Sequence, residues 1–304
     1  MDIFTGLVIK ILEEGFNYGI MAMGVYITYR VLDFPDLSVD GTFPLGMCVT
    51  AALIVAGVNP VLSCFIAFLC GAAAGCLTGF LHVKLKITNL LSGILTMTAM
   101  WSVNLVITGG RAILPYFNRE TIFTGGVASL LTGKLSDYRI VTVVFLAAVV
   151  CKLILDLYLK TKSGLLLRAA GDNQQFVTSI SRDPGKMKII GLAIGNGFTA
   201  LAGSILSQQK ESADISSGTG MVVMALASVI IGTSLFGKIR IMKPTTAAVL
   251  GSIIYRACLV AAIQLGLPTN YLKLLMAVLF TLALVSTNIF SIRRNKPYVN
   301  TPGL

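Results

Sequence analysis

Residues 140–209 decide the fold class of this chain. They read IVTVVFLAAVVCKLILDLYL (140–159), TKSGLLLRAAGDNQQFVTSISRDPGKMK (161–188) and IIGLAIGNGFTALAGSILSQQ (189–209). The outer segments are each about 20 residues of mostly apolar sequence, the length that crosses a bilayer as a helix. Between them lies a long polar segment, whereas helices in a bundle are commonly joined by about 2–8 residues. The pattern predicts two spans separated by a structured docking element for a soluble partner.

The composition places the whole chain in the membrane. Of 304 residues, 55% are hydrophobic and 12% are charged, with a mean hydropathy of +0.84. A soluble domain carries about 25% charged residues. We therefore expect an all-α, polytopic bundle of membrane helices that forms one domain over residues 1–304. The net charge of +11 is explained by basic cytoplasmic loops, and no nucleic-acid partner follows from it.

Charge-poor runs predict about nine spans. Residues 41–81 are long enough for two helices, divided by the turn-like sequence Gly-Val-Asn-Pro at 57–60. The other expected spans cover residues 15–29, 87–110, 140–159, 189–209, 215–237, 245–265 and 274–292.

The distribution of Lys and Arg sets the orientation. Fifteen of these residues fall on the side of the polar segment and seven on the other, and basic residues concentrate in cytoplasmic loops. Residues 161–186 are then a cytoplasmic loop and residues 111–139 an external one. The C-terminus is expected inside, and the N-terminus is expected outside or along the outer interface. The first apolar run is expected to be retained as a span rather than removed as a signal peptide.

The cytoplasmic loop has the pattern of one or two short surface helices. Its apolar side chains are Leu165, Leu166, Leu167, Phe176, Val177 and Ile180. Arg168, Asp172, Asn173 and Arg182 are expected to face the cytosol, with Gly171 forming a turn and Asp172 or Asn173 capping the second helix. Pro184-Gly185 would end it. The loop is either a coupling element or an ordinary interfacial loop.

A second candidate site is VLDFPDLSVDGTFPLG at residues 31–46, which carries Asp33, Asp36 and Asp40. The segment is either a solvated loop or a helix break at membrane depth. Irregular backbone in the membrane is tolerated only where it is buried in protein or lines a cavity.

Other polar residues fall inside the expected spans. Arg256 requires a partner there, and Asp33, Asp36, Asp40, Glu13 and Glu14 are the candidate counter-ions. Asn104 and Asn196 are expected to make interhelical hydrogen bonds or to line a polar path. Lys152 and Asp156 form an i,i+4 pair. Trp101, the only tryptophan, is expected to be a packing residue.

No catalytic motif is recognisable in the chain. It lacks a Gly-x-x-x-x-Gly-Lys-Ser/Thr loop, and the six cysteines and His82 have no metal-ligand spacing. We expect no metal, no cofactor and no enzyme activity in this chain, so a separate protein would supply the energy for any pumping.

The polar loop resembles the coupling region of ABC importer permeases of the branched-chain amino acid and ribose type. The resemblance is carried by Thr161, Gly164, Arg168, Ala169, Gly171 and Asn173, followed by a span rich in small residues. YITYRVLDFPDLSVDGTFPLG (26–46), LLSGILTMTAM (90–100), ASVIIG (227–232) and GSIIYR (251–256) resemble a narrower group of permeases, those for tryptophan or tyrosine.

The resemblance implies a multi-pass protein of the bacterial inner membrane with several partners. These are a second permease copy, two ATPase subunits that bind ATP and magnesium, and an extracytoplasmic binding protein or lipoprotein that delivers a small solute. Gly164, Arg168, Gly171, Asp172, Asn173 and Arg182 would couple the permease to the ATPase. The resemblance also implies two structurally related halves.

Three alternatives to an importer of an aromatic amino acid remain open. An importer of a nucleoside or a sugar would have the same architecture. An ion-coupled secondary transporter would use intramembrane carboxylates, but the docking loop would then have no role. A structural or receptor protein would not require so many small and buried polar residues.

Overall fold

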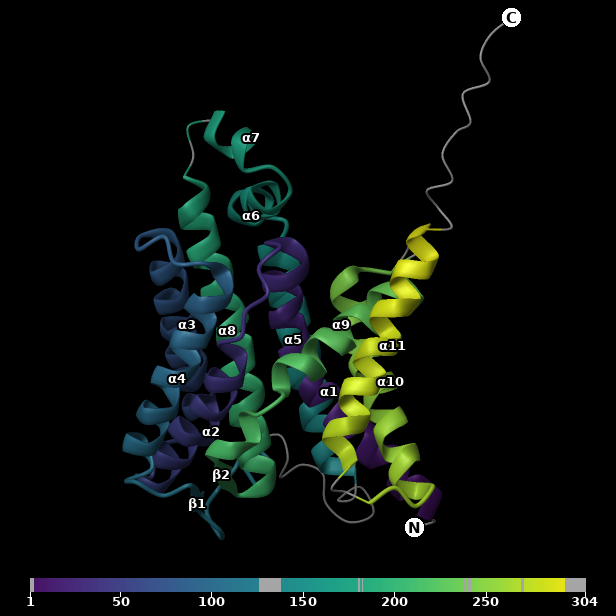
Figure 1. The fold of residues 1–304 in the computed structure, drawn as a ribbon. Coiled ribbons are helices and arrows are strands. Elements are labelled where there is room, and N and C mark those ends of the chain that lie inside the picture. The colour runs from purple at the N-terminus through teal and green to yellow at the C-terminus, as the bar shows by residue number, and fades with distance from the viewer. Residues whose placement is uncertain are drawn as a thin grey trace, which may run out of the picture.

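The computed structural model describes residues 3–125, 138–179, 181, 183–237, 239, 242–268 and 271–292. The described chain is a bundle of helices (Figure 1). The long helices are α1 (Ile3–Val25), α2 (Val39–Val55), α3 (Pro60–Val83), α4 (Asn89–Ile107), α5 (Arg139–Tyr158), α8 (Pro184–Lys210), α9 (Met221–Phe236), α10 (Pro244–Gln264) and α11 (Leu272–Ile292).

Shorter elements connect these helices. A π-helical segment, η1 (Tyr26–Val31), extends α1, and α6 (Lys162–Asp172) and α7 (Gln174–Ser179) follow α5. Strand β1 (Ile113–Pro115) pairs antiparallel with β2 (Ser212–Asp214), and the 3-10 turn η4 (Ile215–Gly218) leads into α9.

The described helices support a polytopic membrane bundle but not the predicted count of nine spans. Six segments are long and apolar enough to cross a bilayer: α3, α4, α5, α8, the segment Ile215–Phe236 and α10. The other three predicted spans fall short for separate reasons. Helix α1 carries Lys10, Glu13 and Glu14, and α2 has only 17 residues. In α11, which runs from Leu272 to Ile292, the apolar stretch whose side chains the structure describes covers only Leu274–Val285.

Apolar side chains cover the outside of the bundle. Phe65 and Leu69 on α3, Leu95 on α4 and Ile154 on α5 are about half exposed. Such side chains are stable on an outer surface when the surrounding solvent is lipid. The interior of the bundle, in contrast, holds buried Asn, Ser and Thr side chains.

Residues 31–46 contain a helix break. Helix α1 ends in η1, residues 32–38 are not helical, and α2 begins at Val39. Asp33 has φ of +52°, which interrupts the helical path. Phe34 and Asp36 in the break are buried, so its irregular backbone is enclosed by protein, as a membrane environment requires. The second half of the predicted segment, including Pro44, belongs to α2.

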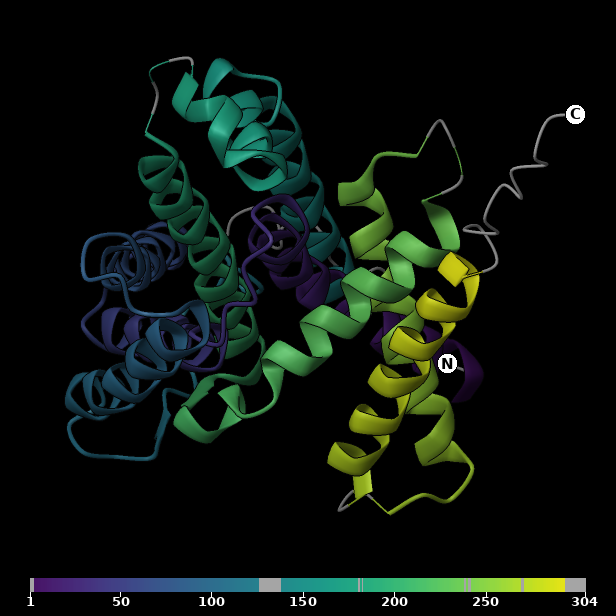
Figure 2. The same cartoon turned by 45° about the horizontal axis from the view of Figure 1, so that its top comes forward.

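The described helices form two groups with the same internal packing. In the first group α1 is followed by a break, α2, α3 and α4; in the second, α8 is followed by a break, α9, α10 and α11. Helix α8 packs on α2 and α3, and α1 packs on α9 and α10. Figure 2 shows the blue α2–α4 group on one side of α1 and the yellow-green α10 and α11 on the other.

The two groups are inverted relative to one another. Gln209, near the end of α8, bonds to Glu13 of α1 at 3.3 Å, whereas Gly195, in the middle of α8, touches Gly24 near the end of α1. Helices α1 and α8 are therefore antiparallel. Inverted repeats of this kind are typical of transport proteins.

The two ends of the bundle differ. Helices α6 and α7 lie together at one end, and β1 and β2 lie at the other, where α1 begins (Figure 1). The assignment of residues 161–186 to the cytoplasm and of residues 111–139 to the outside stays a prediction, and residues 126–137, 180 and 182 of these loops lie outside the described residues.

Candidate functional site

A buried polar network joins the helix break to the middle of α8. The Asp36 carboxylate accepts hydrogen bonds from the Ser38 N–H at 2.9 Å, the Ser38 hydroxyl at 2.6 Å and Asn196 Nδ2 at 2.7 Å. Thr42 donates to Asn196 Oδ1 at 2.8 Å. All four side chains are buried. Since Asn196 is the thirteenth residue of a 27-residue helix, the break lies at the depth of the middle of α8.

Asp40 has a different role from Asp36. It sits in the first turn of α2, and its carboxylate accepts hydrogen bonds from the N–H groups of Gly220 at 3.0 Å and Val222 at 2.8 Å. These N–H groups belong to the first turn of α9, where a helix stabilises an anion. Asp40 thus fastens the start of α2 to the start of α9. Asp33, in contrast, is exposed.

A cavity of about 330 Å³ lies next to Asp40, between α2, α4 and the residues around η4. Its lining includes Trp101 and Asn104 from the second half of α4. Asn104 is fully buried and donates to the Gly41 carbonyl at 3.2 Å. The prediction that Trp101 is a packing residue accounts for only part of its side chain, which is 48% exposed and forms part of the cavity wall.

Arg256 is paired within the bundle. Its guanidinium forms an ion pair with Glu14 of α1 and lies 5.1 Å from the centre of the Tyr18 ring. The ion pairs of the described residues do not join Arg256 to the other candidates, and Glu13, Asp36 and Asp40 accept hydrogen bonds from Gln209, Asn196 and Gly220 instead. The pair links α10 to α1, as does the hydrogen bond of 2.7 Å from the Ser252 hydroxyl to the Gly15 carbonyl.

Helix α6 touches the helix break. Gly171 lies so close to Val31, the last residue of η1, that an added Cβ atom would overlap the Val31 carbonyl oxygen. The buried side chain of Leu167, one turn earlier, packs near Gly191 of α8 and Leu32 of the break. The predicted role of Gly171 as a turn residue is therefore wrong, because it is helical and its small size allows close contact.

The turn between α6 and α7 falls at Asn173. This residue is extended and its side chain accepts a hydrogen bond from the Phe176 N–H at 3.1 Å, as expected of a cap. Arg168 and Asp172 are exposed on α6, and Arg182 lies outside the described residues.

Pro184 does not end α7, which stops at Ser179. It begins α8, with Asp183 capping the Gly185 N–H at 2.8 Å.

The apolar face predicted for this loop is only partly buried. Leu167 and Val177 are enclosed, but Leu165 and Phe176 are 55% and 54% exposed, and Ile180 lies outside the described residues. The exposed apolar and charged side chains of α6 and α7 leave a surface that projects from the end of the bundle (Figure 1).

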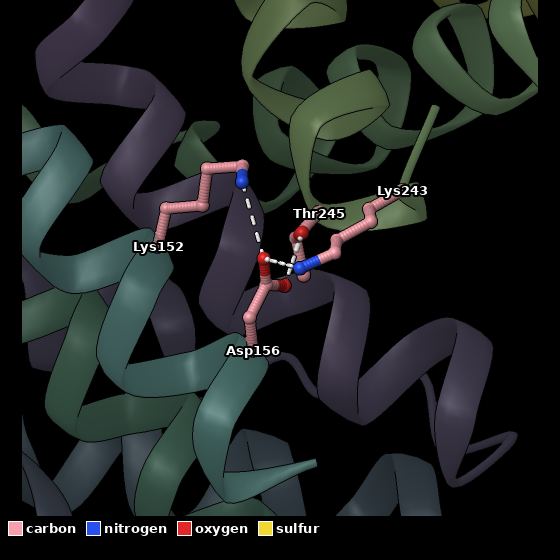
Figure 3. Close-up of polar contacts among 4 residues, drawn as sticks. All are labelled: Lys152, Asp156, Lys243 and Thr245. Carbon is pink, nitrogen blue, oxygen red and sulfur yellow. Dashed lines mark hydrogen bonds and ion pairs between the residues drawn. The ribbon is translucent and has the colours of Figure 1, made fainter. Parts of the chain in front are cut away.

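Asp156 makes more contacts than an i,i+4 pair. It lies in the last turn of α5 and is 8% exposed in the ion pair with Lys152. It also accepts hydrogen bonds from Lys243 at 3.0 Å and Thr245 at 2.7 Å, both at the start of α10 (Figure 3). A hydrogen bond also joins the end of α5 to the start of α6: the Thr161 hydroxyl donates to the Tyr158 carbonyl at 2.7 Å. The predicted pair was therefore only part of a link between two groups of helices.

The second group of helices contains a turn that the sequence analysis overlooked. Ser216 donates to Asp214 Oδ1 through its N–H at 2.8 Å and its hydroxyl at 2.7 Å, which matches the geometry of Ser38 and Asp36. The signal was the repeated pattern Asp-Leu-Ser and Asp-Ile-Ser, each a few residues before Gly-Thr or Thr-Gly. Asn17 was overlooked as well: it is fully buried, and its side-chain amide has no hydrogen-bond partner among the described residues.

Comparison with known proteins identifies the family. The family model described as "Branched-chain amino acid transport system / permease component" matches residues 7–284. The chain belongs to this family. It is therefore a permease, a transport subunit, and a multi-pass protein of the bacterial inner membrane.

Relatives cover nearly its whole length. The chain is 40% identical over 282 residues to the "Tyrosine transport system permease protein" of Clostridioides difficile, covering 93% of this chain and 92% of the relative. It is 28% identical over 283 residues to the "Ribose import permease protein RbsC" of Escherichia coli K12, covering 92% of this chain and 84% of the relative. No solved structure matches the chain.

Proposed function

We propose that this permease carries an aromatic amino acid, with tyrosine the first candidate, into the cytoplasm as part of an ATP-binding cassette importer. The observation that carries the proposal is the 40% identity to a tyrosine transport permease over 93% of this chain. The chain is less similar to the ribose permease of Escherichia coli K12, at 28% identity. This weaker similarity makes a sugar importer the second candidate.

The assembly contains two permease copies, two ATPase subunits and an extracytoplasmic binding protein. Family membership supports the ATPase and the binding protein as partners. The permease dimer rests on the predominance of two-fold symmetry in protein assemblies. ATP and magnesium bind the ATPase subunits. All nine long helices cross the membrane in the assembly, with Glu14 of α1 paired to Arg256 inside the bundle.

Helices α6 and α7 form the docking site for the ATPase. Four features support this: the position between two spans, the projection from the end of the bundle opposite β1 and β2, the cytoplasmic side by charge, and the exposed side chains of Arg168, Asp172 and Phe176. Closure of the ATPase dimer moves α6. The movement reaches the helix break through the contact of Gly171 with Val31. It reaches α8 through the packing of Leu167 near Gly191.

An uptake assay tests the proposed function. The permease is reconstituted in liposomes with its ATPase and binding protein, and ATP-dependent uptake of labelled tyrosine, tryptophan and ribose is compared. The proposal predicts uptake of one of the two amino acids and none of ribose. Uptake of ribose alone would support the second candidate, and uptake without ATP would favour a secondary transporter.

A further inference from the structure

The cavity between α2, α4 and η4 has the position expected of a binding site on a transport path. Asp40, Gly41 and Pro44 line it from the first two turns of α2, directly after the helix break. Trp101 and Asn104 line it from the second half of α4. Substrate sites of transporters commonly form where a helix is interrupted near the middle of the membrane.

The chemistry of the lining favours an amine with an apolar, flat body. The Asp40 carboxylate, which also accepts hydrogen bonds from Gly220 and Val222, carries a negative charge, and the described residues that line the cavity include no Lys or Arg. Asn104 is fully buried, and its Oδ1 accepts no hydrogen bond from the residues that the structure describes. Both groups attract a donor such as an ammonium. Trp101, together with Met97 and Pro44, presents an aromatic and apolar surface against which a ring can stack.

We propose that this cavity is a solute-binding subsite, in which Asp40 and Asn104 attract the amino group of an amino acid and Trp101 contacts its aromatic ring. The volume of about 330 Å³ lies within the range of small-molecule sites, about 300–1,000 Å³. The inference rests on the proposed function and adds to it the residues that select the solute.

Trp101 can be changed without disturbing the bundle, because about half of it is exposed. Leu95 on the same helix is a matched control: it is 49% exposed against 48% for Trp101 and does not line the cavity. In the reconstituted complex, Trp101→Ala is expected to raise the KM for tyrosine uptake about tenfold, since an aromatic contact is lost. Trp101→Phe should restore most of the affinity, and Leu95→Ala should leave uptake and ATPase activity unchanged.

The fluorescence of Trp101 gives a second measurement that does not depend on transport. It is the only tryptophan of this chain; any tryptophans in the ATPase are replaced by Phe. With the permease–ATPase complex in nanodiscs, we expect tyrosine to change the emission of Trp101, and ribose and N-acetyltyrosine to leave it unchanged. Acrylamide should quench the emission, whereas lipids with brominated acyl chains should not.

The outcomes separate the subsite from the proposed function. Absence of uptake of both amino acids by the wild-type complex would overturn the proposed function. If the wild-type complex transports tyrosine but Trp101→Ala and Leu95→Ala behave alike, the subsite is wrong and the function stands. Quenching by brominated lipid but not by acrylamide would place Trp101 against the bilayer. That result would also overturn the proposed subsite and leave the proposed function standing.

Discussion

Gly171 of α6 lies directly against the backbone carbonyl of Val31, at the point where η1 ends and the helix break begins. Five residues further along the chain, Asp36 bonds to Asn196 in the middle of α8. The projecting helix is therefore in contact with a segment that continues to the centre of the bundle. This contact gives a physical route by which movement of α6 changes the position of the break.

Replacing Gly171 with Val should uncouple ATP hydrolysis from transport. The new side chain would overlap the Val31 carbonyl, so α6 would have to move away from the break. We expect a folded permease that still binds the ATPase, with ATPase activity retained and uptake per ATP reduced about tenfold or more. The measurement is ATPase activity and uptake in the same vesicles.

The matched control is Lys162→Val, which places the same side chain on an exposed position at the start of α6, away from the contact with Val31. It should retain most of the coupling. Wild-type uptake per ATP in Gly171→Val would show that the contact with Val31 has no role in transport.

Much of this fold follows from the sequence. Apolar runs separated by charges predicted the approximate position of each long helix, because a bilayer demands about 20 apolar residues per span. The count of spans was less secure. Helix α1 carries three charges, and α2 is shortened by the break, so neither has the composition of a simple span.

The site was harder to predict, since its contacts join distant parts of the chain. The residue types at Asp36, Asn196 and Arg256 indicated that each needs a partner, and for Arg256 the five candidate carboxylates included the correct one. Nothing in the local pattern of residues 152–156 showed that Lys243 would reach Asp156. Likewise, a single Trp in an apolar run does not show whether its side chain will line a cavity or pack inside the bundle.

Lys243 and Lys152 should differ in their effect on transport, although both bond to Asp156. Lys243 connects α5 to the start of α10, whereas Lys152 belongs to α5 itself. We expect Lys243→Met to lower uptake per ATP several-fold, because movement of the α5–α6 end no longer reaches α10, and Lys152→Met to have little effect. Both variants are assayed for ATPase activity and uptake. Equal results for the two would show that the connection to α10 does not contribute.

Arg256→Leu should destabilise the permease strongly. It leaves Glu14 inside the bundle without its cation, and breaking a buried ion pair in this way costs about 3–5 kcal/mol. Thermal unfolding in detergent measures the effect. Arg256→Lys should retain part of the stability. The double variant Glu14→Gln with Arg256→Leu should be more stable than Arg256→Leu alone, and a double variant that is no more stable would show that the pair is not the cause.

Asn196→Ala should lower the stability by about 2–4 kcal/mol, because the Asp36 carboxylate and the Thr42 hydroxyl both lose a buried partner. Thr199→Val is the control on the same helix: Thr199 is also fully buried, but its hydroxyl bonds only within α8, to the Gly195 carbonyl. The loss of thermal stability should be clearly larger for Asn196→Ala. Similar values would indicate that the network contributes no more than any buried polar group.

The central claim is that α6 and α7 connect this permease to its motor, and docking of the ATPase tests it most directly. In one variant, residues 164–179 are replaced by a Gly/Ser linker of the same length, and the purified permease is tested for binding to the ATPase. The account predicts that the wild-type permease retains the ATPase and that the variant, still folded and inserted in the membrane, does not. Equal retention of the ATPase by both would contradict the claim.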